Sequence, residues 1–275
     1  MKKVVFVTGA SAGIGLETAR FLAQAGYIVY GAARRVDRLE QLAGLGVKAI
    51  RLDVTDDASM TDAVNRIISE AGRIDVLINN AGFGSYGAIE DVSLEDARYQ
   101  LEVNVFGAAR LIQLVLPQMR LQQSGRIVNI SSIGGKIATP FGGWYHASKF
   151  ALEGLSDSLR NEVKQFGIDV VVIEPGGVTS EWGGIAFESL QRVSGHTAYK
   201  NMARDFAGAF SGTEGKNAPP AVIAKLIKKA IEVRKPKARY SAGYLAKPTL
   251  ILRKLLPDRL MDKLIMSQVK QMSHA

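Results

Sequence analysis

The sequence predicts an α/β protein, a single domain over residues 1–275 built around a doubly wound parallel sheet. Three observations support this fold class. Short apolar segments rich in β-branched residues alternate with amphipathic helical segments as far as residue 180. The first apolar segment ends in a glycine-rich turn that opens into a helix. Polar residues and glycines follow the other apolar segments, at the strand ends where such a sheet binds its ligand.

The first strand is expected at residues 3–8, and the first helix begins near Leu16. Between them lies the turn Thr8-Gly9-Ala10-Ser11-Ala12-Gly13-Ile14-Gly15, with the spacing G-x-x-x-G-x-G. Glycines let the backbone approach a ligand closely, and the helix dipole favours an anion at the N-terminus of the helix. This strand, turn and helix predict a Rossmann-like site for the pyrophosphate of a dinucleotide.

Two arginines follow the second predicted strand, residues 27–32. A site for NAD(H) needs an acid at this strand end to accept a hydrogen bond from the ribose 2′-hydroxyl, but Arg34 and Arg35 stand there instead. Guanidinium groups suit a 2′-phosphate by charge and by shape. We therefore expect NADP(H) as the cofactor, with the alternative that both arginines are only solvated loop residues.

The third and fourth strands are expected at residues 47–52 and 74–78, with a helix between them over residues 56–71. The third strand ends in Asp53 and Val54, and the fourth ends in Asn79-Asn80-Ala81-Gly82. Amides and a glycine at a strand end fit a ligand site or a purely structural turn, and the sequence favours neither.

The alternation continues through four more elements, a helix at 93–117, a strand at 125–130, a helix at 145–166 and a strand at 169–173. Asn104 lies in an apolar run of the first helix, where an amide must find hydrogen-bond partners. The strand at 125–130 leads into Ser131 and Ser132, and the strand at 169–173 leads into Glu174-Pro175-Gly176-Gly177.

Tyr145 and Lys149 are four residues apart on a predicted helix, so their side chains point the same way. A phenol is a poor acid or base at neutral pH, because its unperturbed pKa is about 10. A fixed positive charge beside it favours the phenolate. The pair is therefore a candidate general acid/base unit, although the same spacing arises by chance on many helix surfaces.

The regular alternation stops after Val178. Residues 180–218 are expected to form a lid of mixed short helices. A helix over 219–233 and a strand over 238–242 follow, and then a C-terminal extension over about 245–275 with one or two basic amphipathic helices broken at Pro257. These helices are expected to cover the edge of the sheet or the mouth of the pocket, and contact with a membrane surface is not favoured.

Composition excludes several classes of function. The chain has no cysteine, which removes disulfides, zinc–thiolate sites and cysteine nucleophiles and fits a reducing cytoplasm. The net charge of +9 comes from basic residues spread along the chain without interleaved aromatic residues, so nucleic acid is not expected as a partner. Neither His146 nor His196 has metal-ligand company, and no metal site is expected.

Taken in order, these motifs resemble the short-chain dehydrogenase/reductase family over residues 3–180. The resemblance implies that Tyr145 is the proton donor or acceptor and that Lys149 holds the nicotinamide ribose and lowers the pKa of the tyrosine. It implies that Ser132 hydrogen-bonds the substrate oxygen and that Asn104 anchors a water in a proton relay. Ser131 is the competitor, and the thirteen-residue separation from Tyr145 favours Ser132.

The resemblance also implies which residues line the cofactor. Ser180 departs slightly from the family pattern, because many members have threonine after the Pro-Gly turn. The implied contacts are Gly9, Ser11, Gly13 and Ile14 at the pyrophosphate and ribose; Asp53 and Val54 at the adenine; Asn80, Ala81 and Gly82 at the middle of the cofactor; and Pro175, Gly176 and Val178 at the nicotinamide carboxamide, in addition to Arg34, Arg35, Tyr145 and Lys149.

The expected activity is NADP(H)-dependent interconversion of a hydrophobic primary or secondary alcohol and its aldehyde or ketone. The substrate class is indicated by six apolar and aromatic side chains: Phe141, Trp144, Trp182, Ile185, Phe187 and Leu190. A side chain in the lid is expected to pack in the protein more often than to select the substrate. Two stretches resemble the branch that contains 17β-hydroxysteroid and retinol dehydrogenases: Glu174-Pro175-Gly176-Gly177-Val178 and Leu255-Leu256-Pro257-Asp258-Arg259. The resemblance implies a homodimer or homotetramer. The alternative is a non-catalytic NADP(H)-binding sensor or scaffold.

Overall fold

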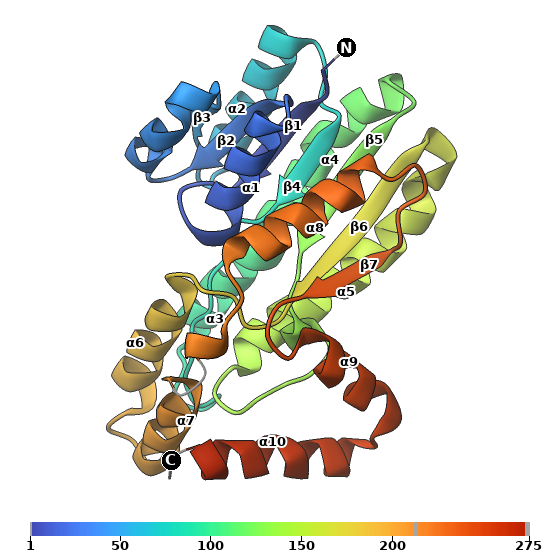
Figure 1. The fold of residues 1–275 in the computed structure, drawn as a ribbon. Helices are drawn as coiled ribbons and strands as arrows, with labels where there is room; N and C mark the ends of the chain where they lie inside the picture. The colour runs from blue at the N-terminus through green and yellow to red at the C-terminus, as the bar shows by residue number, and fades with distance from the viewer. Residues whose placement is uncertain (1, 212–213, 273–275) are drawn as a thin grey trace.

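The computed structural model describes residues 2–211 and 214–272, and within them seven strands form one sheet in the order β3-β2-β1-β4-β5-β6-β7 (Figure 1). Every neighbouring pair of strands is parallel. The strands are β1 (Val4–Thr8), β2 (Ile28–Ala33), β3 (Lys48–Arg51), β4 (Val76–Asn79), β5 (Gly125–Ile130), β6 (Ile168–Pro175) and β7 (Arg239–Ala242). The predicted doubly wound parallel sheet is confirmed.

The strand order reverses at β1, which pairs with β2 on one side and with β4 on the other. In an open parallel sheet this switch point leaves a crevice outside the carboxyl ends of the strands, where ligands bind. Thr8, at the end of β1, and Asn79, at the end of β4, therefore border the place where a ligand is expected.

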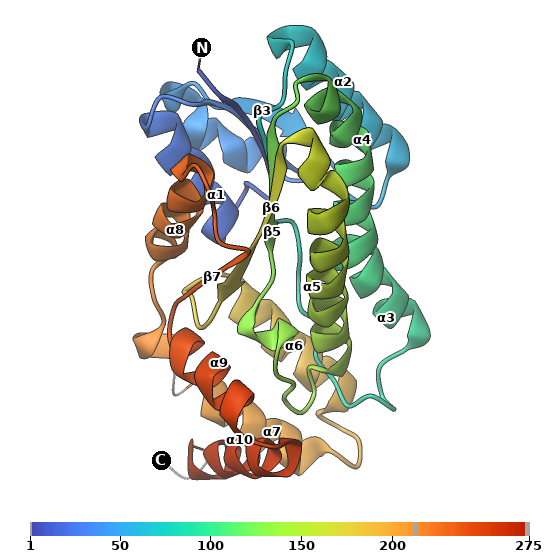
Figure 2. The same ribbon diagram turned by 90° about the vertical axis from the view of Figure 1, so that its right-hand side faces the viewer.

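Helices cover both faces of the sheet (Figure 2). On one face lie α1 (Gly13–Gln24), α8 (Pro220–Glu232) and a 3₁₀ segment (Val36–Leu45); on the other lie α2 (Asp57–Ala71), α4 (Gly107–Leu121) and α5 (Gly143–Val163). Residues of β1 alternate between the two cores: Val5 and Val7 pack toward α1 and α8, whereas Val4 and Phe6 pack toward α2 and α4. Burial on both faces explains why the strands read as continuous apolar runs.

The helix expected at 93–117 is divided into three parts. It consists of α3 (Leu94–Leu101), a five-residue π-helical stretch (Glu102–Phe106) and α4. Ser93 begins α3 by accepting a hydrogen bond from the backbone N–H of Asp96, as its position predicts. Pro117 does not end the helix, which continues to Leu121. The π-helical stretch contains Asn104, and such stretches are frequent at functional sites.

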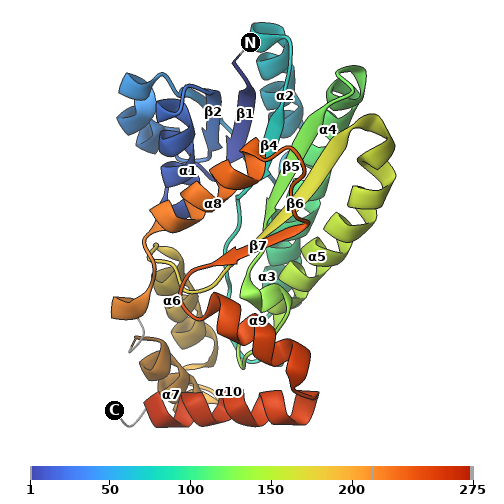
Figure 3. The same ribbon diagram turned by 45° about the vertical axis from the view of Figure 1, so that its right-hand side comes forward.

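Four helices gather beyond the carboxyl ends of the strands (Figures 1 and 3). The expected lid contains α6 (Trp182–Ser194), α7 (Lys200–Ser211) and a 3₁₀ turn (Glu214–Lys216). The C-terminal extension forms α9 (Ala246–Leu255) and α10 (Asp258–Met272), so the predicted break at Pro257 is confirmed. Helix α10 packs on α7, and α9 packs on β7 and on the turn that follows β5. Among residues 2–211 and 214–272, none of the helices combines the length and apolar character that a bilayer crossing requires.

Candidate active site

The glycine turn after β1 can accept an anion. Gly9 and Gly13 have φ angles of +64° and +52°, which favour glycine. A Cβ on Gly15 would lie 2.2 Å from the carbonyl oxygen of Gly9, so no side chain fits there. No side chain caps the N-terminus of α1, whose N-cap residue is Ala12, so its first N–H groups remain available to a ligand. A pyrophosphate fits this turn by shape and by charge.

Asn80 holds the end of β4 to this glycine turn. Its Nδ2 donates to the carbonyl oxygens of Thr8 and Gly9 at 3.0 and 3.1 Å. The Thr8 hydroxyl accepts from the backbone N–H groups of Asn80 and Ala81 at 3.1 and 3.0 Å. Of the two interpretations left open by the sequence, the Asn80 amide serves as a structural staple, and it does so directly beside the ligand site.

Two cavities lie near the ends of the first strands, and one of them borders the glycine turn. One, of about 630 Å³, lies at the N-terminus of α1 and is lined by Ser11 and Gly13 together with Ser180 from the start of the lid. The other, of about 660 Å³, is lined by Arg34 and Asp53. Ile14 is half-buried against the core on this side of the sheet.

The residues that follow β3 are held by local contacts. The carboxylate of Asp53 accepts from the backbone and the hydroxyl of Thr55 at 3.0 and 2.8 Å. Val54 is buried, and its carbonyl oxygen lies 2.4 Å from the position of a Cβ on Gly107. The structure therefore places Asp53 at a cavity wall and Val54 mainly in the packing between this loop and α4.

The arginines after β2 are exposed, and each contacts another side chain. Arg34 donates to the hydroxyl of Tyr99 at 2.9 Å, and Arg35 pairs with Glu181 at 3.2 Å. Arg38 pairs with the same carboxylate at 2.6 Å. These two arginines hold the pKa of Glu181 below its usual range. The sequence analysis missed Arg38 and Glu181, because they are 143 residues apart and only the folded lid brings them together.

The four expected catalytic residues meet beyond β4 and β5. The side chain of Ser132 hydrogen-bonds Tyr145, and the Nζ atom of Lys149 lies 5.9 Å from the centre of the tyrosine ring. A Cβ on Gly82 would lie 3.1 Å from Oδ1 of Asn104 and 3.6 Å from Nζ of Lys149. The π-helical stretch, α5, the end of β4 and the end of β5 therefore converge on one point.

Asn104 uses both amide donors and its amide oxygen in hydrogen bonds. Its Nδ2 donates to the Phe83 carbonyl oxygen and to the Ser148 hydroxyl, both at 2.9 Å, and its Oδ1 accepts from the Phe83 N–H at 3.1 Å. Ser148 is a positioning contact that the sequence analysis missed, although it stands next to Lys149. The resulting lattice ties the π-helical stretch to the helix that carries Tyr145.

Burial sets the protonation of the pair on α5. Desolvation raises the pKa of Tyr145 to about 12, and the hydrogen bond from Ser132 opposes this increase. Desolvation lowers the pKa of Lys149 to about 8, and the charge of Glu153 opposes that decrease. Lys149 donates to the Ile130 carbonyl oxygen at 2.9 Å, and burial is the largest cause of the raised tyrosine pKa, so the expected lowering of that pKa by Lys149 stays a prediction.

Ser131 and Ser132 point to different places. Ser132 accepts from the Gly134 N–H at 3.0 Å while it contacts Tyr145. The hydroxyl of Ser131 is buried, has no hydrogen-bond partner among the described residues and would lie 2.7 Å from a Cβ on Gly135. Of the two serines, Ser132 is the one that contacts Tyr145.

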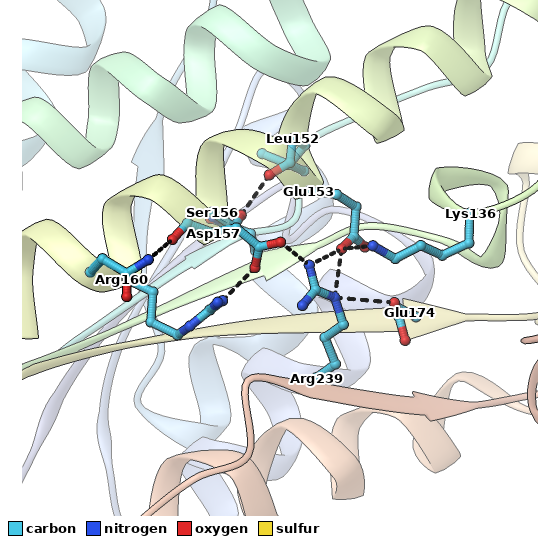
Figure 4. A network of polar contacts seen from close by, with 10 residues as sticks. Lys136, Leu152, Glu153, Ser156, Asp157, Arg160, Glu174 and Arg239 are labelled. Carbon is cyan, nitrogen blue, oxygen red and sulfur yellow. Dashed lines mark hydrogen bonds and ion pairs between the residues drawn. The ribbon is translucent and has the colours of Figure 1, made fainter. Parts of the chain in front are cut away.

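Glu153 belongs to a polar network that fixes α5 to the far edge of the sheet (Figure 4). It is 3% exposed and pairs with Lys136 and Arg239, each at 2.9 Å. Arg239 also pairs with Asp157 at 2.7 Å and Glu174 at 3.5 Å. The network connects β6, β7 and the loop after Ser132, so it holds the helix that carries Tyr145 and Lys149. Only the four-residue spacing from Lys149 could have indicated Glu153 in the sequence.

The end of β6 contacts the C-terminal extension. A Cβ on Gly176 would lie 2.2 Å from the carbonyl oxygen of Tyr244, and the Gly177 N–H donates to that oxygen at 2.9 Å. Val178 forms an isolated bridge with Ala218. Pro175 and Gly176 therefore lie at the expected strand end, in a turn whose shape depends on Tyr244 and Ala246, far later in the chain.

The lid packs directly on Tyr145. Trp182 and Tyr86 place their rings 5.0 and 6.0 Å from the Tyr145 ring, leaving the tyrosine 8% exposed. Of the side chains expected to offer apolar surface, Phe141 and Leu190 are buried in this cluster, whereas Ile185 is 45% exposed. The lid thus forms a small aromatic core of its own over the candidate site. Phe187 contacts Phe210 at its margin.

His146 is structural. Its Nε2 accepts from the Thr139 N–H at 3.0 Å, so Nδ1 carries the proton and donates to the Gly134 carbonyl oxygen at 2.9 Å. Burial lowers the pKa of this histidine, which agrees with the neutral tautomer. The ring fixes the loop between Ser132 and Tyr145.

Comparison with known proteins identifies the same family that the sequence motifs resemble. A model of the short chain dehydrogenase family matches residues 3–189. The chain is 37% identical over 259 residues to a probable short-chain type dehydrogenase/reductase, VdlC, of Helicobacter pylori, covering 94% of each chain. It is also 37% identical over 269 residues to a 3-ketodihydrosphingosine reductase of Bacteroides thetaiotaomicron, covering 94% of this chain and 95% of that relative.

Solved structures agree with the fold. A short-chain dehydrogenase from Streptomyces avermitilis matches with a TM-score of 0.79 and 32% identity, over 100% of this chain and 98% of that one. A serine dehydrogenase complexed with NADP⁺ matches with a TM-score of 0.77 and 25% identity, over 88% and 95%. A short-chain dehydrogenase/reductase from Burkholderia phymatum in complex with NAD matches with a TM-score of 0.77 and 25% identity, over 92% of each chain. By the extent of the family match and the identity to these relatives, the chain belongs to the short-chain dehydrogenase family.

Proposed function

We propose that this protein is an NADP(H)-dependent oxidoreductase that interconverts a hydrophobic alcohol and its ketone or aldehyde, with Tyr145 as the general acid/base. The convergence of Asn104, Ser132, Tyr145 and Lys149 on one point carries the proposal. A nearby glycine turn that fits a pyrophosphate supports it. The alternative, a non-catalytic NADP(H) sensor or scaffold, leaves that four-residue arrangement without a purpose.

Each residue has a role that follows from its place. NADP(H), when bound, supplies or accepts the hydride. Tyr145 gives its proton to the substrate oxygen during reduction and takes it back during oxidation. Ser132, bonded to Tyr145, holds that oxygen in position. Lys149 supplies positive charge beside the site, and Asn104 keeps α5 in register with the π-helical stretch.

The protonation of Tyr145 favours reduction at neutral pH. A phenol with a pKa of about 12 is almost wholly protonated at pH 7, so it can donate a proton without a preceding ionisation. Oxidation needs the phenolate and should therefore be faster in alkaline solution. We infer that the reduction rate does not depend on ionisation of Tyr145 at neutral pH, whereas the oxidation rate does.

NADP(H) is proposed over NAD(H) from the residues that follow β2. Arg34 and Asp53 line the same cavity. Arg35 and Arg38 both pair with Glu181, next to the first turn of the lid. Two or three guanidinium groups around this strand end favour a cofactor with a 2′-phosphate. The solved neighbours include complexes with each cofactor, so the arginines and not the comparisons support this choice.

The substrate is proposed to be hydrophobic, because the surfaces beside Tyr145 are aromatic. The relative named 3-ketodihydrosphingosine reductase bears the name of a lipid ketone, which agrees with this class. The likeness to 17β-hydroxysteroid and retinol dehydrogenases points in the same direction. We further propose a cytoplasmic homodimer or homotetramer. Phe106 and Phe150, which are 57% and 46% exposed beside the Asn104 and Tyr145 segments, offer apolar surface for such an interface.

Consumption of NADPH and of NADH over a panel of aliphatic, steroid and retinoid carbonyl compounds tests the activity. We expect turnover with NADPH, and expect Tyr145→Phe to lower kcat by at least about a thousandfold while NADPH binding is kept. Binding of NADPH by the wild type without turnover of any compound would support the scaffold alternative. A clear preference for NADH would refute the cofactor assignment.

A further inference from the structure

Helix α9 has its apolar face turned toward solvent. The residues at positions 248, 251, 252 and 255 share one face, by the three- and four-residue spacing of a helix, and all four are exposed. Ile251 is 57% exposed, Leu252 37% and Leu255 73%. The opposite face, at positions 246, 249, 250 and 253, turns inward instead. An amphipathic helix in a globular protein normally has the reverse orientation.

The inward orientation of α9 is held by polar contacts. Arg253 donates to the carbonyl oxygen of Lys136 at 3.3 Å and pairs with Asp258 at 2.8 Å. Ala246, at the start of the helix, is completely buried. The helix is therefore anchored through Ala246 and Arg253, and the exposure of Ile251 and Leu255 on the opposite face follows from this attachment.

Basic residues border the exposed apolar face. Lys247 and Lys254 are exposed and lie on the same side of α9, one on each side of Ile251 along the helix. Arg259 is exposed at the start of α10, next to Leu260, which is 49% exposed. Residues 245–269 contain five basic and two acidic residues, and one of the acids, Asp258, is paired with Arg253. The apolar strip thus has a positively charged border.

We propose that α9 and the start of α10 attach the protein peripherally to an anionic lipid bilayer. Leucine and isoleucine side chains would enter the boundary between headgroups and acyl chains, and the bordering lysines and arginine would contact lipid phosphates. This is the arrangement that interfacial amphipathic helices use. Basic residues near a bilayer surface add attraction to anionic lipids, and this attraction is weakened by salt.

A second copy of the chain fits this face less well. A two-fold contact brings the same patch of both subunits together. The basic border formed by Lys247, Lys254 and Arg259 would then meet itself, and like charges would face each other across the contact. Anionic headgroups match the border without this repulsion.

The location of α9 gives the attachment a consequence for the site. Helix α9 packs on the turn Ile133–Gly135, directly after Ser132, and α10 packs on α7 of the lid. Figure 3 shows α9 and α10 at the end of the molecule where α5 begins. A bilayer at this end would lie beyond the carboxyl ends of the strands, the end of the sheet where Tyr145 also lies. The attachment does not depend on turnover, so it stands independently of the proposed function.

Cosedimentation with vesicles tests the attachment. We expect the full-length protein to bind vesicles of phosphatidylcholine with phosphatidylglycerol and to bind pure phosphatidylcholine vesicles weakly. The double variant Ile251→Gln/Leu255→Gln should partition at least about tenfold less, because its apolar contact is lost. The variant Lys247→Gln/Lys254→Gln should lose the preference for anionic vesicles. Leu121→Gln, at an 82% exposed position on α4, is the matched control and should bind like the wild type.

Three results would overturn the proposal. The first is failure of the wild-type protein to sediment with anionic vesicles, and the second is binding of the Ile251→Gln/Leu255→Gln variant that equals that of the control. A third is sedimentation velocity showing that this variant dissociates an oligomer that the control retains, which would assign the face to a second copy. Thermal unfolding of each variant shows that the effects come from the surface and not from loss of the fold.

Discussion

At the scale of single residues, Glu181 forms ion pairs with the two arginines that would bind the 2′-phosphate of the proposed cofactor. It bridges Arg35 and Arg38 at 3.2 and 2.6 Å, and these side chains are about half exposed. A 2′-phosphate approaching the end of β2 offers a stronger charge to the same guanidinium groups. Glu181 therefore competes with the phosphate, and it also links the first turn of the lid to the cofactor side of the sheet.

Replacing Glu181 by Gln should release both arginines and tighten NADPH binding. Because exposed ion pairs contribute about 0.5 kcal/mol, we expect the Kd for NADPH to fall about two- to threefold, with NADH little affected. Fluorescence titration with both cofactors measures this. Glu188→Gln, an exposed carboxylate farther along α6, serves as the control. An equal change for NADPH and NADH would mean that the arginines do not read the 2′-phosphate.

The sequence predicted the identity of the site residues better than their environment. Tyr145, Lys149 and Ser132 could be found because their spacing along the chain reflects helix geometry and a strand end. The raised pKa of Tyr145 could not be predicted, because it depends on burial by Trp182 and Tyr86, which come from distant segments. Arg38 and Glu181 escaped for the same reason.

At the scale of elements, the strand, turn and helix formed by β1 and α1 depend on one close approach. Gly15 lies under the carbonyl of Gly9 and the amide of Asn80, where an added Cβ would be 2.2 and 2.4 Å away. Neither neighbour can move freely, since the Asn80 amide also holds the carbonyl oxygen of Thr8. The turn therefore has room for glycine alone at this position.

We expect Gly15→Ala to destabilise the protein by about 2–3 kcal/mol, because the backbone of the turn must shift. The melting temperature should fall by several degrees, and NADPH affinity should fall with it as the turn opens. Gly154→Ala on α5 is the control: it meets nothing within 4 Å and should stabilise the helix by about 0.5–1 kcal/mol. Equal melting temperatures for Gly15→Ala and the wild type would contradict the close approach.

Elements with a strong period were predicted well, and irregular ones were not. All seven strands were expected, and the central ones, β1, β4, β5 and β6, are short apolar runs between turns. The π-helical stretch at Glu102–Phe106 was missed, since one extra residue per turn leaves no clear trace in the apolar pattern. The 3₁₀ segment at Val36–Leu45 was missed because its buried residues, Leu39 and Leu42, are too few to show a period.

At the scale of the whole molecule, the parallel sheet sets where the site lies, and the lid sets its chemistry. The doubly wound parallel sheet could be predicted from the alternation of strands and helices, although its strand order could not. The way α6 and α7 fold back could not, since their glycine-rich sequence permits many arrangements. Their aromatic side chains pack on Tyr145 and exclude water from the phenol.

Trp182→Ala tests whether the lid sets the pKa of Tyr145. With a pKa of about 12, about one phenol in a thousand is ionised at pH 9, so oxidation of an alcohol by NADP⁺ should still be rising steeply there. Removing the indole admits water, and the pKa should fall toward its ordinary value of about 10. The oxidation rate should then level off at a lower pH.

The pH–rate profile of kcat for oxidation, from pH 7 to pH 11, measures this shift through its shape and not through its absolute rate. Ile185→Ala is the control, because Ile185 lies on the same helix but is 45% exposed and belongs to the solvent face of the lid. Its profile should match that of the wild type. If the Trp182→Ala profile also matched, the indole of Trp182 would not be the group whose packing keeps Tyr145 protonated.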